Sequence, residues 1–245
     1  MQDVDCRCEL TPMDVKARPI IFQGWGVRAI LEGRKTQTRR VIKPQPWQET
    51  ATGPSGWYPA MGHPKAKHYG SENHLRKGLA IDFCLYGQPG DLLWVRETWY
   101  DAGGRGVAQC CLGYVADGDH PHGQTYRIRA SIHMPRWASR VTLRLTDVRV
   151  QRVQEISDGD IEAEGVPGMV AGKYQCTFCN GNGWNYTYPQ GCPHCNGSGL
   201  NPRHHFLLAW DSLNAKRGYG WDTNPWVWAI SFQVTAHQAG DAKCG

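Results

Sequence analysis

Four cysteines in two matching motifs constrain this chain more than any other feature. The motifs are Cys176-Thr-Phe-Cys179-Asn-Gly-Asn-Gly and Cys192-Pro-His-Cys195-Asn-Gly-Ser-Gly, and twelve residues separate Cys179 from Cys192. A Cys-x-x-Cys pair lets two sulfurs reach one metal from a tight turn, and the glycines that follow let backbone amides point at the thiolates. The spacing predicts one zinc ion, with a structural role because a closed four-thiolate shell leaves no position for water.

Two disulfides, or four thiols without a ligand, are the alternatives for these cysteines. The chain opens with the polar, acidic sequence Met1-Gln-Asp-Val-Asp, which has no charged segment followed by an apolar one. Nothing here directs the chain to an oxidising compartment, so we expect reduced thiols and a cytoplasmic protein. His194, inside the second motif, is expected to lie beside the metal site or in solvent, without binding the metal.

The glycine-bearing motif resembles the zinc-binding repeats of DnaJ-type chaperones. Those proteins carry four such units, whereas this chain has two. The resemblance implies a single zinc ion, and it does not imply a chaperone function.

The length of 245 residues is enough to bury a hydrophobic core, and the net charge of +5 permits contact with nucleic acid without requiring it. No run of eighteen apolar residues occurs, so we expect no membrane span. The oligomeric state is left open. We expect these segments: a flexible N-terminus (1–18), a domain (19–235) with loops at 43–80 and 101–125, an inserted zinc module (168–203) and a flexible tail (236–245).

The remaining sequence predicts many short strands and a few short helices, hence an α+β fold built on a small mixed barrel. A helix should end in a left-handed residue at Gly33, and Ser157 should cap another that Gly165 closes. The phase of the apolar residues slips at Asp147, which predicts a β-bulge. Strands are expected near 34–42, 92–99, 126–132, 141–150 and 226–234, and a further helix near 206–218.

Four sequence blocks resemble the ASCH domains, a branch of the PUA-like superfamily, and in particular the longer ASCH proteins of phages and prophages. The resemblance covers roughly residues 19–235 without the loops and the cysteine motifs. It implies a PUA-like β-barrel with a cleft beside Lys35, a nucleic-acid or nucleoside ligand, and, for a phage-encoded protein, the cytoplasm of a bacterial host. The blocks are Ile30-Leu-Glu-Gly-Arg-Lys-Thr-Gln-Thr-Arg-Arg40, Pro89-Gly-Asp-Leu-Leu-Trp-Val-Arg-Glu97, Ala163-Glu-Gly165 and Trp226-Val-Trp-Ala-Ile230.

Some small ASCH proteins are amidohydrolases that remove the acyl group from N4-acetylcytidine with a lysine, a threonine and a glutamate. The resemblance places Lys35, Thr38 and Glu164 on those positions, with the glutamate matched through Ala163-Glu164-Gly165 alone. Other ASCH proteins are ribonucleases or RNA binders without catalysis.

The chemistry of amide cleavage is compatible with these three residues. A threonine hydroxyl attacks an amide only after an adjacent base takes its proton. Lys35 can be that base if its ammonium form is disfavoured, and the arginines at 34, 39 and 40 act in that direction while Glu164 opposes them. Our hypothesis is that Lys35 is the base, Thr38 the nucleophile, and Glu164 the group that orients Lys35 or relays a proton.

Non-catalytic interpretations compete at every one of these positions. Lys35 with Arg34, Arg39 and Arg40 can bind phosphate without chemistry, and Glu164 can be an ion-pair partner for Arg39 or Arg40. Thr38 can be an ordinary strand residue.

Three further residues are candidates for contact with a nucleic acid or nucleoside. Trp25 can stack on a base or belong to the core, and Ser131 and His133 lie at a strand end where ligand-binding loops collect. Two alternatives to a hydrolase therefore stay open: a non-catalytic nucleic-acid-binding module, and a structural protein whose cysteine motifs form a protein-interaction patch.

Overall fold

The computed structural model describes residues 15–49, 56–58, 71–101, 112–118, 127–166, 169–170, 173–174, 176–182, 186–187, 189–195 and 197–237. The two segments expected to be flexible are 1–18 and 236–245. Residues 1–14 and 238–245, which make up most of them, lie outside the described residues.

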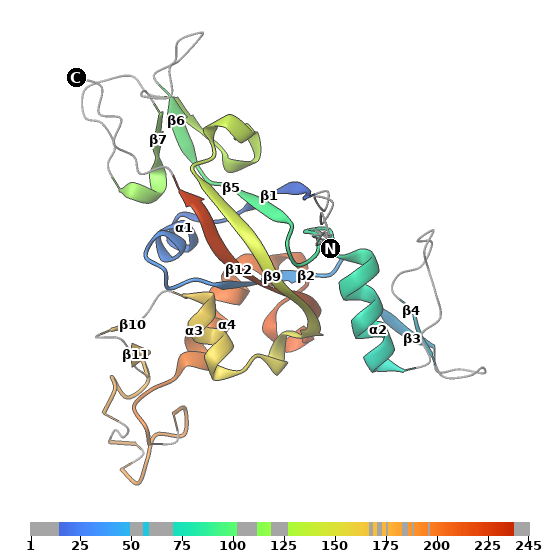
Figure 1. Cartoon of the computed structure of the whole chain (residues 1–245). Coiled ribbons are helices and arrows are strands. Elements are labelled where there is room, and N and C mark those ends of the chain that lie inside the picture. Colours follow the sequence, from blue (N-terminus) through green and yellow to red (C-terminus); the bar gives the residue numbers. More distant parts are fainter. Residues whose placement is uncertain are drawn as a thin grey trace, which may run out of the picture.

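A five-stranded sheet forms the centre of the molecule (Figure 1). Strand β1 pairs with β5 in parallel, and every other neighbouring pair is antiparallel. The order across the sheet is β1 (Ala17–Ile21), β5 (Leu92–Arg96), β9 (Val141–Arg152), β12 (Trp226–His237) and β2 (Gln37–Val41).

The prediction of a closed barrel is wrong, because the edge strands β1 and β2 do not pair with each other. Between them a side chain makes the contact: Nη2 of Arg40 donates a hydrogen bond to the carbonyl of Ile21 at 2.5 Å. A side chain occupies the place where a backbone ladder would close the barrel. The sheet therefore stays open along this edge, and the fold is α+β with a curved, unclosed sheet.

Strand β12 is buried on both faces, which explains its apolar sequence. Trp228, Ile230 and Phe232 belong to the main hydrophobic core, together with Leu93 of β5 and Leu143 of β9. Val227, which directly precedes Trp228, faces the other way into a second apolar cluster with residues of the helices α3 and α4. The two cores thus meet on the two sides of one strand.

The bulge predicted at Asp147 is confirmed. Ser231 of β12 pairs with Asp147, but the next residue, Phe232, pairs with Leu145, so β9 carries one extra residue at this point. The extra residue restores the inward direction of the apolar side chains on both sides of the slip.

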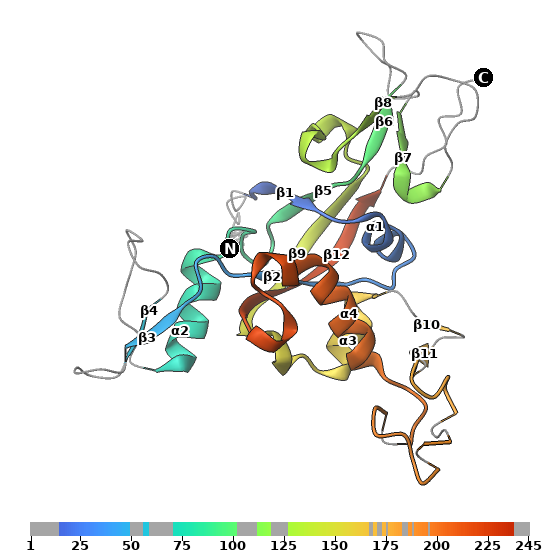
Figure 2. The same cartoon turned by 180° about the vertical axis from the view of Figure 1, so that it is seen from behind.

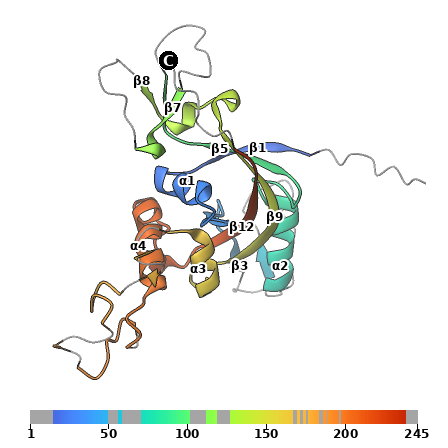
Figure 3. The same ribbon diagram turned by 60° about the vertical axis from the view of Figure 1, so that its left-hand side comes forward.

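Within the described residues, four α-helices flank the sheet, with α1, α3 and α4 on one side of it and α2 on the other (Figure 3). The predicted ends are confirmed: Gly33 follows α1 with φ 74°, Ser157 accepts from the amide of Asp160 at 3.2 Å, and Gly165 closes α3 with φ 59°. The helices are α1 (Gly24–Leu31), α2 (Glu72–Gly78), α3 (Asp158–Glu164) and α4 (Pro202–Asn214).

Both segments expected to be loops contain regular structure. Segment 43–80 holds the hairpin β3 (Trp47–Glu49) and β4 (Gly56–Tyr58) and the helix α2. The prolines of this segment all precede residue 65, and α2 begins beyond them, where the hydroxyl of Ser71 caps the amide of His74. In segment 101–125, β7 (Leu112–Tyr114) joins β6 (Trp99–Asp101) and β8 (Arg127–Arg129) in a three-stranded sheet.

The cysteine motifs lie away from the central sheet, beyond the ends of α3 and α4 (Figure 2). A short hairpin of β10 (Met169–Val170) and β11 (Lys173–Tyr174) leads into them. In the part of the chain that the structure describes, no helix is long and apolar enough to cross a membrane.

Candidate ligand pocket and metal centre

A cavity of about 430 Å³ opens between α1, β2 and α4, next to the end of α3. Several aromatic residues contribute to its wall, among them Phe22, Trp25, Tyr86, Phe206 and Trp228. Lys35, Thr38 and Glu164, which are distant in the sequence, all line this one cavity. A mostly apolar cavity with a few converging polar groups is the usual form of a site for a small molecule or a nucleobase.

The backbone turn after α1 places Lys35 in the cavity. The amides of Arg34 and Lys35 both donate to the carbonyl of Ala29 at 2.9 Å, and the amide of Thr36 donates to the carbonyl of Ala163 on α3 at 2.8 Å. These bonds turn the chain before β2 begins. Lys35 therefore does not follow the alternation of the strand.

Gly165 allows α3 to approach this turn. A Cβ atom at position 165 would lie 3.0 Å from Cβ of Lys35 and 3.2 Å from Cβ of Ala29, and the residue has φ 59°. Both the space and the backbone conformation thus require glycine. The close approach sets Glu164 beside Lys35.

The Lys35 amine donates two hydrogen bonds of 2.7 Å, one to Oε2 of Glu164 and one to the carbonyl of Glu164. The side chain of Lys35 is only 2% exposed. Burial lowers the pKa of Lys35, the charge of Glu164 opposes that shift, and the charges of Arg40 and Arg39 add to it. Loss of the ammonium proton is therefore easier here than for a lysine in water.

Arg39 is held inside an ion-pair network rather than presented to a ligand. Its guanidinium donates to Oε1 of Glu164 at 3.2 Å, to Oδ2 of Asp160 at 2.8 Å and to Oε1 of Gln37 at 2.7 Å. Glu164 is thus shared between two cations, one oxygen facing each. The network fixes the carboxylate that holds Lys35.

The other predicted ligand-binding residues fall into two groups. Arg40 and Trp25 line the cavity: the Arg40 guanidinium lies 4.9 Å from the centre of the Phe22 ring, and the Trp25 ring lies 5.6 Å from Nζ of Lys35. Arg34 is exposed and paired with Glu32. Ser131 and His133 lie in a short helix after β8 and do not line this cavity.

Sequence reasoning missed several residues of the cavity, because they come from segments remote from the motifs. Phe22 precedes α1, Tyr86 belongs to the turn before β5, and Trp228 is the cross-strand neighbour of Arg40. Lys43 and Arg217 also line the cavity. For Trp228 a usable signal existed, since it alternates in phase with the buried residues of β12.

The four cysteines of the two motifs form a compact, buried cluster. Their sulfur atoms all lie within 4.8 Å of one another, with Sγ of Cys176 at 3.9 Å from Cys192 and Sγ of Cys179 at 3.7 Å from Cys195. A disulfide needs about 2.05 Å between sulfurs, so these are free thiols. Four sulfurs at about 2.3 Å from a tetrahedral metal are about 3.8 Å apart, so the cluster fits a metal ion.

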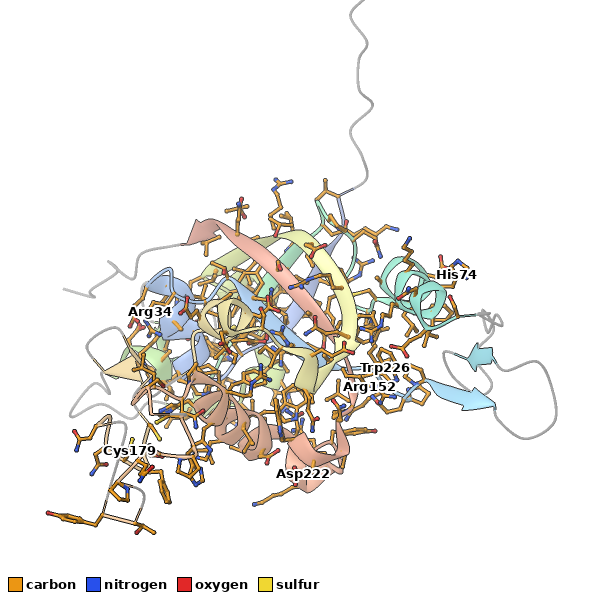
Figure 4. The ribbon with its side chains drawn as sticks, turned by 90° about the horizontal axis from the view of Figure 1, so that it is seen from below. Arg34, His74, Arg152, Cys179, Asp222 and Trp226 are labelled. Atoms are coloured by element: carbon orange, nitrogen blue, oxygen red, sulfur yellow. The ribbon has the colours of Figure 1, made fainter. Side chains whose placement is uncertain are left out.

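The two motifs have the same local structure. The amide of Gly181 donates to the carbonyl of Cys176, and that of Gly197 donates to the carbonyl of Cys192, both at 3.1 Å. Both glycines have positive φ, 81° and 77°. The amide of Gly199 donates to Sγ of Cys195 at 3.2 Å, as expected for a backbone that points at thiolates. Figure 4 shows Cys179 at one end of the molecule, far from His74 on α2.

His194 packs against the Phe178 ring, with 4.1 Å between the ring centres. These two residues hold the same position in the two motifs, the third of each Cys-x-x-Cys unit. In the structure the four sulfurs form the cluster without His194.

Comparison with known proteins leaves the family of the chain open. No protein-family model matches the sequence, and no curated protein matches it significantly. Among solved structures, a crystal structure of an ASCH domain from Lactobacillus crispatus JV V101 matches 91% of this chain and 81% of that chain, with 10% sequence identity and a TM-score of 0.35. A similarity this remote carries no argument about function.

Proposed function

We propose that this protein is an ASCH-type protein that binds a modified nucleoside or nucleic acid, and that it hydrolyses the acyl amide of an N4-acylated cytidine or a related base. The observation that carries the proposal is the buried Lys35 amine, which shares an aromatic-walled cavity with Thr38 and Glu164. The resemblance of the sequence blocks to ASCH domains suggests the class of substrate.

The proposed reaction uses the three polar groups in sequence. The neutral Lys35 amine takes the proton of the Thr38 hydroxyl as Oγ1 attacks the acyl carbon, and a tetrahedral intermediate forms. The Lys35 ammonium then gives this proton to the departing N4 nitrogen, and the C–N bond breaks. Water hydrolyses the acyl ester on Thr38, with Lys35 again as base. Glu164 and the Glu164 carbonyl hold the amine in place, because both accept from it at 2.7 Å.

The test is turnover of N4-acetylcytidine to cytidine, followed by chromatography. A general base contributes about 10²- to 10⁴-fold to a rate, so Lys35→Met should lose activity on that scale. Thr38→Ala should be inactive, whereas Thr38→Ser, which keeps a hydroxyl, should retain part of the turnover. Full activity of both Lys35→Met and Thr38→Ala would disprove the mechanism.

One observation favours a second candidate, a binding pocket without catalysis. Lys35 is held by Glu164 through two short hydrogen bonds, which is also the geometry of an ion pair that only supports structure. Under this alternative the wild-type protein binds N4-acetylcytidine and leaves it intact. The same chromatographic assay, combined with a binding measurement, separates the two functions.

For the cysteine cluster we propose one zinc ion with a structural role. Four cysteine sulfurs within 4.8 Å of one another form the donor set that zinc prefers in closed sites. Metal analysis of purified protein should find zinc at one equivalent per chain, and the variant Cys195→Ser should lower that content. Substoichiometric metal in the wild-type protein, or a different ion, would contradict this assignment.

A further inference from the structure

The cavity carries much more positive than negative charge. Five cationic side chains line it, and among the described residues Glu164 is the one carboxylate that does so. Both oxygens of Glu164 are already occupied, one by Lys35 and the other by Arg39. Arg39 is also paired with Asp160, so the positive charge that is available to a ligand is that of Arg40, Lys43 and Arg217. The five cations are Lys35, Arg39, Arg40, Lys43 and Arg217.

Depth separates these cations into two groups. Lys35 and Arg39 are buried, 2% and 5% exposed, at the closed end of the cavity. Lys43 and Arg217 are exposed to solvent while lining the same cavity, so they form its rim. Arg40 lies between the two groups, half-buried against the Phe22 ring.

The two rim cations come from different parts of the fold. Lys43 follows β2, and its amine lies 4.8 Å from the centre of the Tyr219 ring, which stands two residues beyond Arg217. This contact brings the end of β2 and the segment after α4 to one side of the opening. Within the described chain, neither Lys43 nor Arg217 forms an ion pair.

Each of these residues also has a structural contact. Arg217 ends the short helix Ala215–Arg217 that continues α4, where a cation interacts favourably with the helix dipole. Lys43 lies against the Tyr219 ring, but neither contact supplies an anion that balances the two charges. Two exposed cations that line one cavity without ion-pair partners among the described residues can bind a phosphate.

We propose that Lys43 and Arg217 bind a phosphate group, and that the ligand of this pocket is a nucleotide unit whose base enters the cavity while its phosphate stays at the rim. The inference rests on the proposed function, since it assumes a nucleobase in the cavity. It adds that the substrate carries phosphate, either as a mononucleotide or as part of a strand.

Calorimetric titration with three ligands tests this proposal: N4-acetylcytidine, its 5′-monophosphate, and a short single-stranded oligonucleotide with one N4-acetylcytidine. Because a hydrogen bond to a charged group is worth more than a neutral one, the monophosphate should bind about 10- to 100-fold more tightly than the nucleoside. The advantage should shrink as salt concentration rises.

The double variant Lys43→Ala/Arg217→Ala should lose this preference and keep its affinity for the nucleoside. Both residues are exposed, so the fold should be unaffected. Lys216→Ala is the matched control, because Lys216 is an exposed neighbour that does not line the cavity. If the natural ligand is a nucleic-acid strand, the oligonucleotide should bind more tightly than the monophosphate. Equal binding of the two would indicate a mononucleotide.

Two different failures can be told apart. Equal affinity of the wild-type protein for nucleoside and monophosphate, or a preference that survives in the double variant, overturns the phosphate site and leaves the proposed function standing. No binding of any of the three ligands overturns the proposed function and the phosphate site together.

Discussion

The central sheet and the cysteine module, by which we mean the part of the chain at 176–200 that carries the two cysteine motifs, differ in what is buried inside them. Around the sheet, large apolar side chains from β1, β5, β9 and β12 and from α1 and α2 form one core, and charged residues such as Lys35 and Glu164 are buried close to it. In the cysteine module the buried cluster consists of the four thiols alone. Apolar burial can support the sheet, whereas for so small a module we propose that a bound metal supplies the stability.

The difference shows what each region tolerates. The apolar core around the sheet is large enough to bury Lys35, Arg39, Glu164 and their partners in a fixed arrangement. The described residues of the cysteine module bury no apolar cluster of comparable size, so we expect its structure to depend on one bound ion.

Metal removal should have the largest effect, and it tests most directly whether the module and the sheet are stabilised independently. Structural zinc binds with about 10–16 kcal/mol of apparent free energy, so a chelator should abolish the order of residues 176–200. Amide exchange should show rapid exchange there and unchanged protection in the strands β9 and β12. The variant Cys84→Ser, which alters a thiol outside the cluster, is the control. Joint loss of protection in both regions would show that the module and the sheet are one folding unit.

A substitution that creates an empty space in the main hydrophobic core should lower the stability of the sheet and leave the cysteine module intact. Leu143 is fully buried on β9, and its replacement by alanine should lower the free energy of unfolding by about 2–5 kcal/mol. The metal content should stay at that of the wild type. Denaturant unfolding measures the loss, and Leu208→Ala, at a position 51% exposed on α4, should change it by less than about 0.5 kcal/mol. Metal loss in folded Leu143→Ala would contradict the independence of the two regions.

The cap of α3 tests whether the helix that carries Glu164 belongs to the sheet domain. Ser157→Ala removes the acceptor for the amide of Asp160 and should cost about 1 kcal/mol. Ser157→Asp, which restores an acceptor, should recover most of it. If thermal unfolding of the sheet does not respond to Ser157→Ala, α3 opens separately from the sheet.

The smallest effect is a movement of the pH–rate profile. If Lys35 is the base, kcat/KM rises with pH as its ammonium loses a proton, with a midpoint below that of free lysine because burial lowers the pKa. Glu164 raises this pKa, so in Glu164→Gln the midpoint should move to lower pH. Arg40 lowers it, so in Arg40→Gln the midpoint should move to higher pH. Movement of both midpoints in one direction would argue against Lys35 as the titrating group.

Local features of the fold could be predicted from the sequence because few residues determine them. The left-handed end at Gly33, the cap at Ser157 and the bulge at Asp147 each depend on the chemistry of a few neighbouring side chains. The cysteine cluster was predictable for the same reason, since the motif spacing alone brings the sulfurs together.

Long-range features were not predictable in this way. At the open edge between β1 and β2 the Arg40 side chain reaches the carbonyl of Ile21, and no local pattern reports that contact. The same applies to the rim of the cavity, where Lys43 contacts the Tyr219 ring and Arg217 lines the same cavity. The pairing of Lys35 with Glu164 was suggested only by resemblance, although Gly165 marks the close approach.

The position of β12 has a consequence for biosynthesis. This strand is the last of the sheet to leave the ribosome, yet in the finished sheet it lies between β9 and β2. Until residues 226–237 emerge, β2 has no neighbour to pair with, and the ligand cavity lacks the wall that Trp228 supplies. The nascent chain therefore carries an incomplete site, with exposed strand edges, through most of translation.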